Sequence, residues 1–133
     1  MRTLNTKATK VLEALTKGLL EGTSRKVDNT NGAWMPVSVE HLYGTHYRTA
    51  HYFEQNGDLV PDPDVEFLKT PEGWVPLAIQ QCTGHYSRPI RLSDDGTTIT
   101  GIAPRAYADL VSFCNMWMSN VAAQQGGLKA LKA

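Results

Sequence analysis

Hydrophobic residues recur every three or four positions near the start of the chain, which is the spacing that puts them on one side of an α-helix. The repeat runs from Leu4 through Leu12 to Leu19, with three lysines and Glu13 between its members. Gly22 is a plausible end point, because glycine commonly follows the last turn of a helix. The pattern predicts an N-terminal helix within residues 1–22 that packs its apolar side on a sheet.

The same spacing returns near the other end of the chain. Tyr107, Leu110 and Trp117 belong to a second apolar stripe, and Pro104 suits the first turn of a helix. The stripe predicts a C-terminal helix over residues 104–124. Two glycines follow it, and we expect the short tail beyond them to be frayed.

Between the two stripes the period changes to alternation of apolar and polar residues, which is typical of strands. Residues 23–33 are polar and are expected to form a loop. Asn56-Gly57 is the strongest hairpin signal. Pro61 and Pro63 are expected to interrupt pairing, so that residues 60–64 form a bend or a sheet edge. The predicted strands cover residues 34–43, 46–55, 65–69, 74–82, 88–92 and 97–100.

Every connection between these strands is short, which favours antiparallel pairing over parallel units with crossover helices. The sequence therefore predicts the α+β class, as one domain over residues 1–133. In it, an antiparallel β-meander sheet over residues 34–101 is flanked by an N-terminal helix and a C-terminal helix.

Composition narrows the classes of function. Thirteen basic and thirteen acidic residues give a formal net charge of zero, which argues against sequence-independent nucleic-acid binding. Cys82 and Cys114 are too few for a disulfide framework, and Cys114 falls in the apolar helical stripe. With no signal-peptide pattern and no apolar run long enough to span a bilayer, we expect a cytoplasmic protein without a membrane partner.

A metal site is the first candidate chemistry. His41, His46 and His51 lie close together in sequence, and imidazoles are common metal ligands. His46 and His51 are five residues apart, however, so an unbroken strand points them to opposite faces. The acidic residues that follow offer further ligands for a cation, although they match no known calcium loop. They are Asp58, Asp62, Asp64 and Glu66.

Other catalytic patterns are weak. No serine stands in a nucleophile-elbow context, and no glycine-rich loop precedes a helix. Cys82 and His85 offer a thiol and a base, but nothing local positions them. We therefore expect a protein that is not an enzyme and has no cofactor. The alternative is a metal-dependent enzyme that uses the His and Asp residues of the 41–64 region.

Aromatic and arginine side chains supply a recognition surface instead, since these types are favoured at binding sites. Core filling competes equally with this interpretation for the large aromatic residues, among them Trp34, Phe53 and Trp74. The residues predicted to bind a ligand or partner are Arg48, Tyr52, Trp74, Tyr86, Arg88 and Arg91.

The segment HYFEQNGDLVPDPDVEF, residues 51–67, resembles a family of small uncharacterised bacterial proteins encoded largely on phages, plasmids and other mobile elements. The similarity extends to residues 34–40 and 113–118. One departure is Gln80-Gln81-Cys82, where a Gln-Asp pair is expected. The family implies no catalytic residues. It implies a setting in which small proteins antagonise host defence, by binding a defence protein or by sequestering a signalling nucleotide, and we expect a host protein slightly more than a nucleotide.

Overall fold

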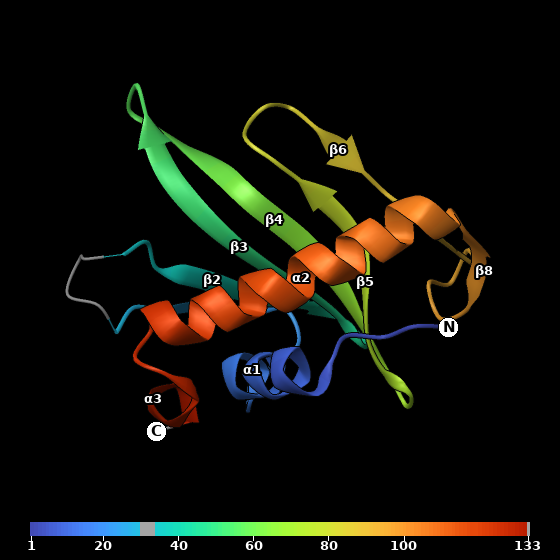
Figure 1. Ribbon diagram of the computed structural model, residues 1–133, viewed down its shortest axis with the longest axis horizontal. Coiled ribbons are helices and arrows are strands. Elements are labelled where there is room, and N and C mark those ends of the chain that lie inside the picture. The colour runs from blue at the N-terminus through green and yellow to red at the C-terminus, as the bar shows by residue number, and fades with distance from the viewer. Residues whose placement is uncertain (30–33, 133) are drawn as a thin grey trace.

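A computed structural model describes residues 1–29 and 34–132, and it has the predicted α+β fold (Figure 1). Residues 30–33, part of the expected loop, and residue 133 lie outside the described residues. The helices are α1 (Thr6–Thr16), α2 (Pro104–Gln124) and α3 (Leu128–Lys132). The strands are β1 (Ser24–Val27), β2 (Val37–Tyr43), β3 (His46–Gln55), β4 (Asp58–Thr70), β5 (Gly73–Gln80), β6 (Tyr86–Ser87), β7 (Ile90–Leu92) and β8 (Ile99–Ile102).

The described strands form a six-stranded antiparallel sheet in the order β1-β2-β3-β4-β5-β6, and β7 pairs with β8 in a separate two-stranded sheet. The meander is as predicted, but two details of the prediction were wrong. β1 lies in the segment expected to be a loop, because its polar residues pair along the edge of the sheet with β2. The last hairpin leaves the main sheet instead of extending it.

The helices follow the apolar stripes with one correction. Asn5 caps α1 by accepting a hydrogen bond from the Ala8 backbone N–H at 2.8 Å. The helix then ends at Thr16, not near Gly22, because Gly18 adopts a positive φ of 72° that starts a turn. α2 has the predicted bounds, and the tail expected to be frayed forms α3. No described helix is long and apolar enough to cross a membrane.

The β3–β4 hairpin confirms one turn prediction and corrects another. Asn56 and Gly57 have φ values of 53° and 85°, as their two-residue turn requires. β4 then runs without interruption through both prolines. Asp62 and Pro63 lie opposite His51 alone, so the extra residue forms a β-bulge that accommodates a proline without a ladder hydrogen bond.

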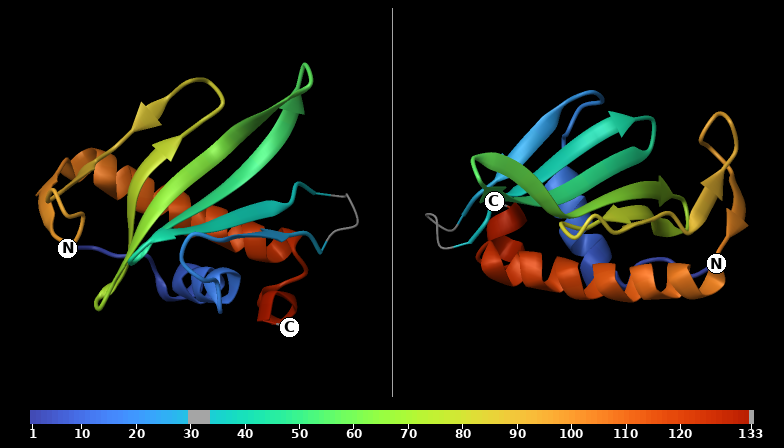
Figure 2. Two further views of the ribbon diagram at one scale, coloured as in Figure 1. Left: turned by 180° about the vertical axis from the view of Figure 1, so that it is seen from behind. Right: turned by 90° about the horizontal axis from the view of Figure 1, so that it is seen from above.

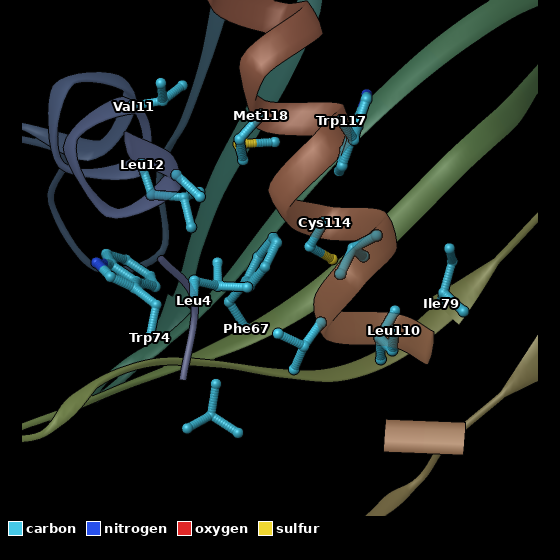
Figure 3. Packing of buried hydrophobic residues seen from close by; sticks show 14 of the residues in the cluster. Leu4, Val11, Leu12, Phe67, Trp74, Ile79, Leu110, Cys114, Trp117 and Met118 are labelled. Atoms are coloured by element: carbon cyan, nitrogen blue, oxygen red, sulfur yellow. The ribbon is translucent and has the colours of Figure 1, made fainter. Parts of the chain in front are cut away.

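The hydrophobic core lies between α1, α2 and one face of the sheet (Figures 2 and 3). Phe67 and Trp74 pack edge to face with ring centroids 6.2 Å apart. Cys114 is fully buried, as its place in the apolar stripe predicts, and burial raises the pKa of its thiol well above the usual range. Trp34, in contrast, is 56% exposed and is not part of the core.

A buried polar residue follows the end of α2. Gln125 is completely buried, and its Oε1 accepts a hydrogen bond from the Asn29 backbone N–H at 2.7 Å. Its Nε2 donates to the Met35 carbonyl oxygen at 3.3 Å. One side chain thus connects the C-terminal end of α2 to two points on the chain before β2, and its own polar atoms are satisfied inside the protein.

Candidate functional site

The face of the main sheet that points away from α1 and α2 carries no helix within the described residues; we call it the open face (Figure 2). Because side chains alternate along a strand, the pairing register determines which residues share this face. One row across the strands contains Ser24, Glu40, Arg48, Glu66 and Ala78. The next row contains Lys26, Ser38, Ala50, Asp64, Gln80 and Tyr86.

Arg48 is the centre of an ion-pair network on the open face. Its Nε lies 3.1 Å from Asp64 Oδ1, its Nη2 lies 3.6 Å from Glu66 Oε1, and its Nη1 lies 3.8 Å from Glu40 Oε1. Arg88 adds a second guanidinium, with Nη1 donating to Glu66 Oε2 at 3.2 Å. Two arginines and three carboxylates therefore share one surface, with each arginine neutralised by neighbours.

Burial within this network alters the acidity of its members. Only 13% of the Asp64 side chain is exposed, and burial raises the pKa of its carboxyl group while Arg48 lowers it. Its Oδ1 makes an ion pair with Arg48 but no aligned hydrogen bond. Burial also raises the pKa of the Tyr52 phenol, and the negative charge of Asp64 adds to that effect. The hydroxyl of Tyr52 is thus a neutral hydrogen-bonding group.

A hollow of about 240 Å³ lies beside Arg48 on the open face. The hollow exists because the side chains of Ser38 and Ala50 are small, and Tyr52 and Glu40 border it. A smaller hollow on the other side of Arg48 is bordered by Asp64 and Tyr86, among other residues. The arginine therefore stands between two depressions, each with a tyrosine at its border, and this arrangement can hold protruding groups of a partner.

The β7–β8 hairpin closes one end of the open face. His46 lies on the same face as Arg48, two residues before it, and its Nε2 is 2.9 Å from the Gly96 carbonyl oxygen. The ring of His46 also stacks on Tyr43 at 4.4 Å. β5 is buried at every position from Trp74 to Ile79, which is consistent with cover on both faces of that strand.

Four of the six residues predicted to bind a partner meet on the open face: Arg48, Tyr52, Tyr86 and Arg88. Trp74 does not, since it is 1% exposed and its indole N–H donates to Glu13 Oε1 at 3.1 Å. Its side chain fills the core because it lies on the face of β5 that points away from the Arg48 network and toward the helices. Arg91 lies on β7 beside Gly101, away from the network.

The histidines considered as candidate metal ligands lie apart, each with its own partners. His41 Nδ1 is 2.9 Å from the Leu19 carbonyl oxygen, and its ring stacks on Tyr47 at 4.2 Å. His51 is 6% exposed under α2, where Nδ1 accepts a hydrogen bond from the Trp117 indole N–H at 3.4 Å. Burial lowers the pKa of His51, although Asp62 opposes this. Across residues 1–29 and 34–132, no three His, Cys, Asp or Glu side chains are grouped to hold a metal.

The predicted acidic bend and thiol pair also separate. Asp58 is exposed at the hairpin turn, whereas Asp62 accepts a hydrogen bond from the Cys82 backbone N–H at 3.3 Å. A hydrogen bond to Asp62 raises the pKa of the exposed Cys82 thiol. This environment keeps the thiol protonated, which is the opposite of the activation that a nucleophilic cysteine requires.

Sequence reasoning missed the partners of the arginines. Asp64 and Glu66 were considered as ligands for a cation, and no carboxylate was predicted to pair with Arg48 or Arg88. The available signal was parity: Asp64 and Glu66 are two residues apart, as are Arg48 and Ala50 on the neighbouring strand. The register that brings them together depends on the bulge at Pro63, which the sequence did not predict.

Another hollow lies away from the open face, between α1, β1 and α3, with a volume of about 400 Å³. Lys17, Arg25 and Lys132 contribute positive charge to it. Arg25 Nη1 donates to the Leu15 carbonyl oxygen at 2.9 Å, in the last turn of α1. Cations at the C-terminal ends of helices compensate the helix dipole, so the positive charge here has a structural explanation.

Comparison with known proteins places the chain in a family. No curated protein and no solved structure shows significant similarity to it. A family profile described as "Domain of unknown function (DUF6908)" matches residues 6–127, from the start of α1 to the end of α2 and just beyond. Since this match covers the whole of α1, α2 and every described strand, the chain belongs to the DUF6908 family.

Proposed function

We propose that this chain is a non-catalytic binding protein that holds a protein partner on the open face of its sheet. The observation that carries the proposal is the group formed by Arg48, Arg88, Tyr52 and Tyr86 on this face, which no helix of the described residues covers. Arginine and tyrosine are enriched among the residues that dominate binding energy at protein interfaces. Tyr86 is 56% exposed and available to such a partner.

The charges of the network favour a protein partner over a nucleotide on this face. A phosphate group needs guanidinium donors that are free to form paired hydrogen bonds. Arg48 already has three carboxylates within 3.8 Å, and Arg88 pairs with Glu66. A phosphate here would have to approach those carboxylates. A protein surface can instead offer a basic group to Glu40, whose side chain is 44% exposed, and apolar groups to the tyrosines.

The choice of partner follows from the expectation that proteins resembling residues 51–67 are encoded on phages and mobile elements. We propose a host defence protein, which the chain would antagonise by occupying one of its surfaces. We also propose that the two meet in the cytoplasm, where both cysteines, which are free in this structure, remain reduced. This part of the proposal is an analogy of setting, and the fold itself does not specify the partner.

Affinity capture with surface variants tests the proposal. The chain is immobilised, host lysate is passed over it, and a captured protein is identified by mass spectrometry and then measured as a purified pair. We expect Tyr86→Ala and Tyr52→Ala each to weaken that binding by about fivefold or more, as interface hot spots do. Arg91→Ala is the matched control, because Arg91 is exposed on β7 outside the network.

Two results would overturn the proposed function. Equal capture of the partner by both tyrosine variants would show that the open face is not the contact surface. Purified chain that carries a stoichiometric metal and turns over a substrate would contradict a non-catalytic role. Circular dichroism of each variant confirms that the fold is retained before binding is compared.

A further inference from the structure

A further hollow lies on the opposite side of the sheet from the open face, where α2 passes over the last strands. Its volume is about 340 Å³, within the range of small-molecule sites. It is lined by Ile79, Gln81, His85, Ser87, Ala106, Asp109, Leu110 and Phe113. Ile79 pairs with Ser87, so both point toward α2, whereas their neighbours Gln80 and Tyr86 belong to the open face.

The floor of this hollow is apolar and belongs to the core. Ile79 is 7% exposed and Leu110 is 4% exposed, and both lie at the edge of the buried cluster (Figure 3). Phe113 is half-buried one turn further along α2, with its ring stacked on Trp117 at a centroid distance of 6.2 Å. Because β6 has two residues, the sheet ends before it fills the space beneath α2.

The rim of the hollow is polar, and its polar side chains have no bonding partner among the described residues. Gln81, His85, Ser87 and Asp109 form no side-chain hydrogen bond or ion pair with any residue in the described part of the chain. The Arg48 network differs, since its charges are paired with one another. An apolar floor and aromatic wall with several free polar groups at the rim are the usual composition of a small-ligand site.

We propose that this hollow binds a small flat aromatic compound that carries N–H donors and is neutral or positively charged. Asp109 supplies the one formal charge among the lining residues, and these include no lysine or arginine. A carboxylate accepts hydrogen bonds from amino or amidinium groups and repels phosphates and carboxylates. Phe113 offers a face for an aromatic ring, and Gln81 and Ser87 offer further hydrogen bonds to its edge. The site is separate from the open face and does not depend on its partner.

Nuclear magnetic resonance titration of the labelled full chain tests the site with three probes: benzamidinium, adenine and benzoate. Benzamidinium and benzoate share a ring and differ in the sign of their charge. We expect saturable shifts of amides around Ser87 and Asp109 with benzamidinium and adenine, and none with benzoate. Asp109→Asn is expected to weaken benzamidinium binding by about tenfold, the loss of one charge-assisted hydrogen bond.

Control variants separate the site from general effects. Asp94→Asn removes one exposed carboxylate from the β7–β8 turn, outside the hollow, and should leave binding unchanged. Ala106→Trp fills the hollow from α2 and should abolish the shifts while circular dichroism shows an intact fold. Equal shifts with benzoate, full binding by Asp109→Asn or Ala106→Trp, or no saturable shift with either nitrogen-bearing probe at millimolar concentration would each overturn the proposal.

Discussion

Replacement of Trp74 by alanine separates a core role from a binding role for this residue. Trp74 is 1% exposed, contacts Phe67 and Tyr47 edge to face, and has Lys69 Nζ 5.6 Å from its ring centroid. A buried tryptophan removes about 150–250 Å² from water. At about 25 cal/mol per Å² this corresponds to roughly 4–6 kcal/mol, and measured Trp→Ala losses in cores are about 3–5 kcal/mol.

We therefore expect Trp74→Ala to lower the free energy of unfolding by about 4 kcal/mol. Unfolding entropy is about 2.1 cal/mol/K per residue, which gives about 0.28 kcal/mol/K for a chain of 133 residues. The expected drop in Tm is then about 14 °C. Trp74→Phe keeps an aromatic ring but loses the hydrogen bond to Glu13, so it should cost about 1 kcal/mol plus a small packing term.

Urea denaturation followed by circular dichroism measures these differences, and a thermal scan checks the Tm. Tyr86→Ala is the matched surface variant, because Tyr86 is 56% exposed, and it should change stability by less than about 0.5 kcal/mol. A decrease in Tm of less than about 4 °C for Trp74→Ala would refute the core role. Such a result would indicate that Trp74 is available for binding and does not stabilise the core.

Two further predictions concern buried polar side chains. Burial lowers the pKa of His51 below its ordinary value of 6.5. At pH values near and below 6.5 the folded state therefore binds fewer protons than the unfolded state, and the free energy of unfolding should fall as the pH decreases through 6.5. Urea titrations between neutral and mildly acidic pH should show this slope, and His51→Gln should remove it; an unchanged slope would contradict it. Gln125→Leu should cost about 1–3 kcal/mol, because the Asn29 N–H and Met35 carbonyl lose their partner, and a denaturant midpoint equal to that of the parent would exclude this role.

The elements that local chemistry determines could be predicted from the sequence. The apolar stripe of α2 and the Asn56-Gly57 turn are encoded within a few residues, and both are where the pattern places them. β1 and the continuous β4 were mispredicted because their stability comes from neighbouring strands. A polar edge strand has little pattern of its own, and a proline in a bulge is a consequence of pairing.

The candidate site was predicted only in part, because residue type is a local property whereas strand register depends on pairing. Residue type was sufficient to select Arg48, Tyr52, Tyr86 and Arg88, which share one face. Type could not distinguish them from Trp74, because the face of β5 that a tryptophan occupies depends on strand register and on the helices above it. The hollow under α2 combines the β5–β6 connection with a helix some twenty residues later, and no local pattern joins those segments.

The position of the β7–β8 hairpin sets the direction from which a partner can approach. Its turn rests on His46 and Tyr43, so the open face is walled at that end. The β3–β4 hairpin projects away from α2 at the other end of the network (Figure 1). A partner bound over Arg48 would thus be bordered by the β7–β8 hairpin on one side and by the long β3–β4 hairpin on the other. An extended segment of a partner would fit here in one direction, across the strands from β1 toward β6. This geometry would impose a fixed orientation on the partner.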